Sequence, residues 1–404
     1  MVSWTFYRLK PRPGTGFHFG QGGFEEESAA SCPSDTLFAA LVATEAALNG
    51  DQGVQALVAP FIERKPPFLL TSLFPFIGDL PLLPLPHIRL VLPEGGVRRH
   101  KRLKKLRYVS PAIWQRILAR EPLEKLFGEE GIFLQDGQVW ISAAETAAFP
   151  DAWRDLLPIK STRWRKWLRG ADGRRWLRQQ KIWAFTSVDR VTVDRLSSAS
   201  AVYRIGRTVY SPGCGLWFGL QWPDGVDDSI RSHLEVLFHF LGDQGLGGER
   251  SIGYGQFTWE RAEWALNLPE AKPHAPLLTL SRYLPRPGEL PEVLQGEEVA
   301  YKLVTVSGWL YAPGHGAYRR RKVRFLAPGS VFYAATSAPW GQIVDVHPLS
   351  TDKKDKSTDK SQAAPQSKQT DNEHVDKWNG PPIWRYGYAC PVGLPEKHKK
   401  VSYA

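Results

Sequence analysis

The order of strand-like and helix-like runs is the feature that most restricts the fold of this chain. Alternating aromatic and polar residues predict a strand near the N-terminus, and an apolar helix follows after a loop rich in Gly and Glu. Much later, a second strand, a second helix and a last strand follow one another. The expected elements are a strand at 3–10, a helix that Ser34 or Asp35 caps and that runs to Leu48, a strand at 215–222, a helix at 230–241 and a strand at 256–263. This order fits a β-α-β-β-α-β unit with a long insertion in its middle.

We therefore predict an α+β protein built from two ferredoxin-like (RRM-like, β-α-β-β-α-β) domains. The first domain is expected at 1–265, with a basic, Trp-rich insertion at about 81–211 and a glycine-rich loop at 242–255. A Pro-rich connection leads to a second ferredoxin-like domain at 276–404. Within it, residues 350–377 are polar with interspersed Lys and Asp, which predicts a disordered loop. The strand-like runs of the second domain lie at 277–283, 301–311, 322–325 and 330–335.

The charge balance favours a polyanionic partner. Lys and Arg number 52 against 41 Asp and Glu, which gives a formal net charge of +11 and a pI near 9.5. RNA, DNA and an anionic membrane surface would all be attracted, so net charge does not choose among them. The most apolar stretch, at 66–93, is broken by several prolines, which excludes a membrane-spanning helix there.

The three cysteines are expected to be reduced thiols. Cys32, Cys214 and Cys390 lie far apart, and neither a CxxC pair nor a Cys/His cluster at zinc-ligand spacing is present. The sequence therefore predicts no metal site. A positively charged segment followed by an apolar segment and a cleavage site is missing, so we expect the chain to stay in the cytoplasm.

A glycine-rich turn after the second predicted helix is the first candidate binding element. It contains Gly247, Gly248, Arg250, Ser251 and Gly253. Glycines let backbone N–H groups approach a phosphate chain closely, and Arg250 adds positive charge. The turn is neither a P-loop nor a Rossmann turn, because the GxxxxGK[ST] pattern is missing and the turn ends a helix instead of starting one. The alternative is a flexible connector.

Two basic segments are further candidates for an RNA-binding surface. The run from Arg98 to Tyr108 has an apolar residue at every third position, so its leucines would dock while its cations face a phosphate backbone. Its candidate contacts are Lys101, Arg102, Lys104 and Lys105. The segment from Arg163 to Lys181 mixes Trp164, Trp167 and Trp176 with arginines, as single-strand binders do. For both segments, the alternative is a solvated charged face over a packed apolar one.

A third candidate is a hairpin arm. Val alternates with polar residues from Val188 to Arg195, and a second alternating run reaches Tyr210. This pattern predicts two paired strands that carry Arg190 and Arg195 on a surface. The pattern leaves open whether that surface contacts RNA or a neighbouring protein subunit.

Several of these segments together resemble the fourth subunit of Csm complexes, the type III-A CRISPR effectors, within the RAMP superfamily. The order and spacing of the segments carry the resemblance, which covers most of the first predicted domain. The matching segments are Phe17 to Gly20 with the acidic loop Glu25 to Glu27, Pro33 to Leu41, Lys104 to Tyr108, Val188 to Thr192 and Gly247 to Phe257, and the tail Ile383 to Ala389 is similar to the family's C-terminal strand.

The resemblance implies a non-catalytic RNA-binding subunit that caps one end of the complex and needs no cofactor. It implies contacts with the 5′ tag of the crRNA, with the large polymerase/cyclase subunit and with the backbone subunits, whereas target RNA is met indirectly. The glycine turn, together with the loop and helix start at His18, Ser34 and Asp35, is expected to border the tag. The hairpin around Arg190 would displace a base where tag meets spacer.

Two other functions remain open at this point. Some RAMP proteins are CRISPR RNA endoribonucleases, and His18 is the candidate general acid or base for such an activity. The alternative for His18 is a packed or hydrogen-bonded residue near the glycine turn, because no partner His or Tyr stands at a fixed spacing. A type III-B counterpart of the subunit would keep the binding role and change only the protein partners.

Overall fold

The computed structural model describes residues 2–20, 28–88, 103–121, 131–193, 200–310, 318–348 and 380–395. Its centre is an antiparallel sheet with the strand order β12-β1-β11-β3-β4, and β2 pairs with the other end of β11. Every residue of the central strand β11 is buried. The elements of this part are β1 (Ser3–Pro11), α1 (Ser34–Ile62), β2 (Leu69–Leu70), β3 (Phe74–Ile77), β4 (Leu80–Pro81), β11 (Cys214–Trp222), α6 (Asp228–Gln244) and β12 (Phe257–Ala262).

These elements confirm the predicted order of the first unit. In the chain, β1, α1, β3, β11, α6 and β12 follow one another as strand, helix, strand, strand, helix and strand. Aromatic side chains join the sheet to the second helix, because the ring of Tyr7 lies 5.1 Å from that of Phe238 and 5.2 Å from that of Phe218. The apolar side chains whose spacing predicted these elements are therefore the ones that pack between the sheet and the helices.

The start of the first helix differs from the prediction. Pro33 is the N-cap residue, and neither Ser34 nor Asp35 caps the helix. Both side chains are fully buried and point to the second part of the chain. The helix also runs past Leu48 to Ile62 across a kink at Gly50. A capping role was the local expectation for Ser and Asp, and tertiary contacts override it here.

The insertion between β4 and β11 forms a subdomain with its own hydrophobic core. A small sheet with the order β5-β6-β8-β7 lies at its centre. Trp153, Trp164 and Trp183 are buried in this core, to which Ile77 and Cys214 of the central sheet also contribute. Other insertion residues, Val109 and Trp140 among them, pack in the main core. The elements are β5 (Leu83–Pro84), β6 (Tyr108–Val109), α3 (Pro111–Leu118), β7 (Gly131–Leu134), β8 (Val139–Ser142), α4 (Trp164–Leu168) and α5 (Ala171–Gln179), with 3-10 turns η2 (Gln135–Gly137), η3 (Ala143–Ala148) and η4 (Asp151–Leu156).

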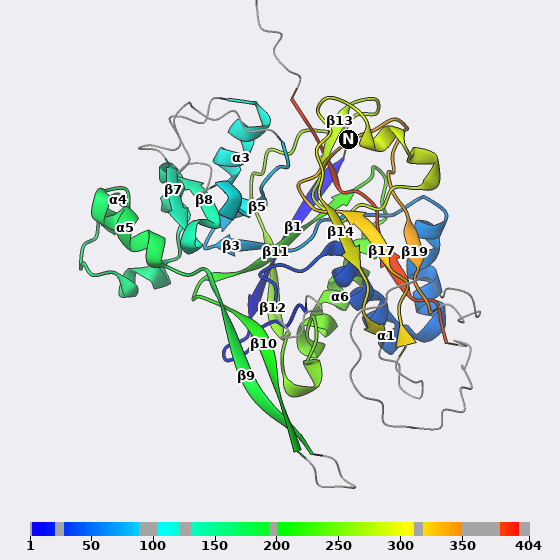
Figure 1. Ribbon diagram of the computed structural model, residues 1–404, viewed down its shortest axis with the longest axis horizontal. Coiled ribbons are helices and arrows are strands. Elements are labelled where there is room, and N and C mark those ends of the chain that lie inside the picture. Colours follow the sequence, from blue (N-terminus) through cyan, green and yellow to red (C-terminus); the bar gives the residue numbers. More distant parts are fainter. Residues whose placement is uncertain are drawn as a thin grey trace, which may run out of the picture.

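A long hairpin leaves the insertion and returns to the central sheet. Strands β9 (Trp183–Val193) and β10 (Ser200–Tyr210) pair in register from Trp183 with Tyr210 to Val193 with Ser200. Figure 1 shows the two strands extending away from the rest of the molecule as a twisted ribbon. This finding confirms the predicted hairpin arm.

The C-terminal part consists of small antiparallel sheets. The strand pairings are β18-β13-β21, β14-β17, β15-β16 and β19-β20. The elements are β13 (Pro276–Thr279), β14 (Leu303–Val306), β15 (Trp309–Leu310), β16 (Tyr318–Arg319), β17 (Val323–Leu326), β18 (Val331–Tyr333), β19 (Ile343–Asp345), β20 (Trp384–Tyr386) and β21 (Pro391–Gly393), with 3-10 turns η6 (Pro287–Glu289) and η7 (Glu292–Leu294).

Where the structure describes the C-terminal part, it does not repeat the first unit. The strand-like runs were placed correctly, and the predicted strand in the tail is β20. However, the described residues after 276 contain no α-helix, so a second β-α-β-β-α-β unit is not seen in them. The physical reason is that no long segment with helical apolar spacing follows the Pro-rich connection, and one helix of the first unit covers β20 instead. The predicted loop at 350–377 lies outside the described residues.

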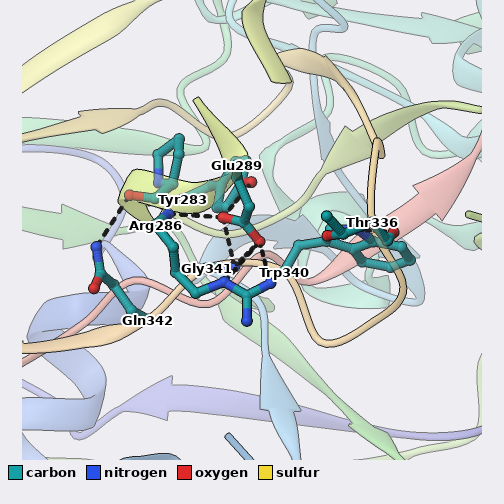
Figure 2. Close-up of polar contacts among 8 residues, drawn as sticks. Tyr283, Arg286, Glu289, Thr336, Trp340, Gly341 and Gln342 are labelled. Atoms are coloured by element: carbon teal, nitrogen blue, oxygen red, sulfur yellow. Dashed lines mark hydrogen bonds and ion pairs between the residues drawn. The ribbon is translucent and has the colours of Figure 1, made fainter. Parts of the chain in front are cut away.

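The core of the C-terminal part is organised around the buried carboxylate of Glu289. Glu289 accepts hydrogen bonds from Tyr283 Oη at 3.0 Å, from the backbone N–H of Arg286 at 2.7 Å and from that of Gly341 at 3.1 Å. The Arg286 guanidinium adds an ion pair at 2.7 Å. Figure 2 shows these groups converging on one carboxylate from separate loops. A single side chain therefore ties together segments that have little regular structure.

The two parts share one continuous core. Phe38 of α1 lies 5.2 Å from the ring of Tyr386, and Tyr388 Oη donates a hydrogen bond to the backbone carbonyl of Phe61. The three cysteines are buried free thiols, as predicted, and burial raises the pKa of each. Among the helices of the described ranges, none is long and apolar enough to cross a membrane.

Candidate nucleic-acid interface

The glycine-rich turn is held against the loop that follows β1. The Gly248 N–H donates to the His18 carbonyl at 2.9 Å, and the Gly255 N–H donates to the Gly16 carbonyl at 2.8 Å. Leu246 closes the turn on itself, because its N–H donates to the Gly255 carbonyl at 2.9 Å. These backbone donors are used within the protein. The shape of the turn is therefore fixed before any ligand binds.

Two of its glycines are required by the close approach to His18. Gly247 has a φ of +104°, and a Cβ placed there would lie 2.5 Å from the His18 carbonyl oxygen. A Cβ on Gly248 would lie 2.7 Å from the His18 ring. Any larger residue would push the turn away from the loop. The sequence pattern had suggested phosphate contact as the reason for these glycines, and the structure gives them a packing reason as well.

His18 lies beneath the turn. Only 6% of its surface is exposed, and its Nδ1 donates to the Gly206 carbonyl on β10 at 2.6 Å. The residue therefore connects the loop after β1, the hairpin base and the glycine turn. This is the packed and hydrogen-bonded arrangement that the sequence left as the alternative to catalysis.

The tip of the turn faces solvent. Arg250 and Ser251 are exposed in the short 3-10 turn η5 (Arg250–Ile252), and Gly253 ends it with a φ of +87° and open space around the position of a Cβ. In the described part of the chain, no carboxylate forms an ion pair with Arg250. The tip of the turn thus presents the positive charge of Arg250 and the hydroxyl of Ser251 to solvent, and backbone hydrogen bonds hold its base in place.

Sequence reasoning missed Arg207, which belongs to the same surface. Its guanidinium lies 5.6 Å from the centre of the Tyr254 ring, and its Nε donates to Thr186 Oγ1 at 3.1 Å. It also contacts the Gly14 carbonyl at 3.4 Å. The sequence could have indicated this position, because Arg207 stands two residues after the buried Ile205 on β10 and alternate residues of a strand share a face.

Ser34 is not part of this surface. Its hydroxyl accepts a hydrogen bond from the backbone N–H of Arg282 at 2.9 Å, and the side chain is fully buried between the two parts of the protein. The prediction that Ser34 contacts RNA is therefore wrong for its side chain. The local pattern of a polar residue at a helix start could not reveal that a distant segment covers it.

The basic run lies elsewhere on the molecule. Lys104 and Lys105 are exposed, whereas Leu106 is buried in the main core and Leu103 packs against it, as predicted. Lys101 and Arg102 lie outside the described residues. The run directly precedes β6 and α3, and Figure 1 shows α3 in the upper half of the view and the loop after β1 in the lower half. The structure does not bring Lys104 and Lys105 together with the glycine turn.

The hairpin carries both charge and exposed apolar surface. Arg190 is half-buried and stands opposite Tyr203 in the pairing of β9 with β10, whereas Arg195 lies outside the described residues. On the other face of the ribbon, Val191 and Val202 stand opposite each other and are exposed. An exposed apolar pair on a projecting strand is typical of a surface that another molecule covers.

The Trp-rich segment packs inward. Trp164 is buried, and Trp176 lies 6.3 Å from both Trp153 and Trp167, measured between ring centres. The side chains of Arg169 and Arg175 face solvent. Trp167 and Trp176 are half-buried and pack against the same core, so the structure supports the packed alternative for this segment.

Comparison with known proteins agrees with the motif resemblance. A model of the CRISPR Csm4 C-terminal domain matches residues 273–356. The CRISPR system Cms protein Csm4 of Mycobacterium tuberculosis (strain ATCC 25618 / H37Rv) is 28% identical over 333 residues, which cover 81% of this chain and 88% of that protein. The protein of the same name from Thermococcus onnurineus (strain NA1) is 23% identical over 307 residues, 74% of this chain and 80% of that protein.

Solved structures show the same fold. The crystal structure of the Csm3-Csm4 subcomplex in the type III-A CRISPR-Cas interference complex contains a chain with a TM-score of 0.57 and 19% identity, with coverage of 85% of this chain and 96% of that one. The Csm1-Csm4 cassette in complex with pppApA gives a TM-score of 0.51 and 17% identity, with coverage of 99% and 100%. The resemblance predicted from the motifs is therefore confirmed.

Proposed function

We propose that this chain, a relative of the Csm4 subunits of type III-A CRISPR complexes, is the non-catalytic subunit that binds and caps the 5′ tag of the crRNA. The packing of the glycine turn against His18 and the hairpin base is the main support. It places Arg250 and Ser251 on a rigid, exposed tip, with Arg207 beside the base. Such a tip suits a single-stranded phosphate chain, because a preformed site loses little entropy on binding.

The proposed role also assigns a function to the hairpin of β9 and β10. Arg190 lies on a ribbon that leaves the body next to the glycine turn, so the ribbon can reach along an RNA bound at the turn. We propose that it displaces a base where tag meets spacer. The exposed pair Val191 and Val202 would then lie against a base or a neighbouring subunit, which removes apolar surface from water.

The chain is further proposed to bridge two kinds of subunit. Relatives of this fold have been crystallised with Csm3 in one case and with Csm1 in another. A cap that contacts both the large polymerase/cyclase subunit and the backbone subunits would need two separate surfaces, and the insertion and the C-terminal part supply candidates. We assign the ferredoxin-like fold to the first unit on its strand and helix order. We also propose that the chain works in the cytoplasm, together with its guide RNA.

The proposed role involves no cleavage by this chain. His18 is almost fully buried, and its Nδ1 is committed to the Gly206 carbonyl, so the ring is poorly placed to exchange a proton with an RNA hydroxyl.

Replacing Arg250 and Ser251 together with Ala is expected to weaken binding of tagged RNA by roughly 10- to 100-fold and of untagged RNA much less. The charge-assisted contacts at the tip are lost, while the backbone of the turn is kept. The measurement is binding of labelled RNA with and without the repeat-derived 5′ tag, at several salt concentrations, to the chain co-expressed with Csm partners.

The matched control is Arg175→Ala, which removes an exposed charge from α5. It should affect both RNAs alike. Equal losses on both RNAs in the Arg250/Ser251 variant would reduce the tip to a nonspecific electrostatic contact. Cleavage of RNA in the same tube that disappears in His18→Ala would make the chain a nuclease and end the non-catalytic proposal.

A further inference from the structure

A group of arginines surrounds one aspartate where α1 meets the C-terminal part. Asp35 is fully buried, and its Oδ1 accepts a hydrogen bond from Arg282 Nη1 at 2.9 Å. Its Oδ2 accepts one from Arg385 Nη1 at 3.0 Å. Both carboxylate oxygens are therefore engaged by guanidinium groups, each of which still has further N–H donors.

A third guanidinium nearby has no such partner. Arg320 is half-buried, and its Nε is fully buried without a hydrogen-bond partner. Among the described residues, no carboxylate forms an ion pair with it. Burial and the neighbouring charge of Arg385 lower the pKa of Arg320 to about 10, although Asp35 acts in the opposite direction. Three positive charges thus face a single negative charge.

A small hollow lies beside Arg320 and Arg385, and neither Asp35 nor Arg282 is part of its lining. Its volume is about 10 Å³, and its polar lining comes from Ser307, Arg320, Arg321 and Arg385. A space of this size holds about one oxygen atom. An anion with several oxygens would place one of them inside the hollow and keep the others at its mouth.

We propose that Arg320 and Arg385 form a binding site for a phosphate group at this hollow, with Asp35 holding the Arg385 guanidinium in place. Guanidinium groups match phosphate oxygens in geometry, and an arriving dianion or phosphodiester would balance the excess positive charge. The phosphate belongs either to the RNA backbone or to free phosphate or a nucleotide. The RNA source rests on the guide-RNA function proposed above, whereas the site itself does not.

The test uses the full chain with Arg320→Gln, which removes the unpaired charge and leaves both contacts of Asp35 intact. Inorganic phosphate is expected to raise the melting temperature of the unmodified chain above that in NaCl of equal ionic strength. Arg320→Gln should bind phosphate roughly tenfold or more weakly. Arg324→Gln is the matched control, because it removes an exposed arginine from neighbouring β17.

A second arm identifies the source of the phosphate. In the complex with Csm partners, weaker binding of guide RNA by Arg320→Gln, with a salt slope smaller by about 0.7, assigns the site to one RNA phosphate. Unchanged RNA binding with lost phosphate binding assigns it to free phosphate or a nucleotide. No phosphate stabilisation beyond the NaCl control, with identical behaviour of the two variants, overturns the site. That result would not affect the proposal that Arg250 binds the tag, so the two proposals can be disproved independently of each other.

Discussion

Asp35→Ala is expected to destabilise the chain by about 3–5 kcal/mol. The substitution removes the only carboxylate that the described residues place between Arg282 and Arg385, and Arg385 is almost fully buried. Two guanidinium groups would then remain in a poorly hydrated position without a counter-charge. The loss should weaken the junction between α1 and the C-terminal part, because those two ion pairs cross it.

Urea denaturation of the full chain measures this effect as a lower midpoint. Asp243→Ala is the control, since Asp243 pairs with Arg12 on the surface and its loss should cost no more than about 1 kcal/mol. Asp35→Asn keeps the shape of the side chain and removes its charge, so its urea midpoint should be close to that of Asp35→Ala. If Asp35→Ala were as stable as the surface control, the junction would not depend on these ion pairs.

Glu289→Ala is expected to lower the free energy of unfolding by a similar amount, about 3–5 kcal/mol. Tyr283 Oη and the Gly341 N–H would lose their acceptor inside the protein, and Arg286 would lose its ion pair. Because the groups that contact this carboxylate come from two segments more than 50 residues apart, its loss should loosen the contact between those segments.

Thermal unfolding measures the loss, and hydrogen exchange at the Gly341 amide locates it. Glu289→Gln keeps one acceptor oxygen and should be less destabilising than Glu289→Ala. Glu292→Ala provides the control, because Glu292 is exposed in the next 3-10 turn and its removal should change stability by less than about 0.5 kcal/mol. Normal exchange protection of Gly341 in Glu289→Ala would contradict the organising role of this carboxylate.

The candidate interface was only partly accessible to sequence reasoning. Glycines at positions 247 and 248, together with His18, were correctly placed in one region because they stand in a specific order of motifs. Arg207 was missed, since an arginine in an alternating strand looks the same whether it contacts a turn or solvent. Ser34 was misassigned for the opposite reason: its local pattern is that of an exposed helix start, and a distant segment covers it.

The sequence by itself determined the elements of the first unit and the inward packing of apolar faces, because apolar spacing acts over a few residues and directly sets which face is buried. It also determined the hairpin arm and the identity of the relatives. Only the tertiary structure decided that Asp35 binds two arginines from far along the chain, that α1 covers β20, and that Lys104 and Lys105 lie away from the glycine turn. These outcomes depend on which distant segments meet, and charge pairing between distant segments leaves no periodic pattern in the sequence.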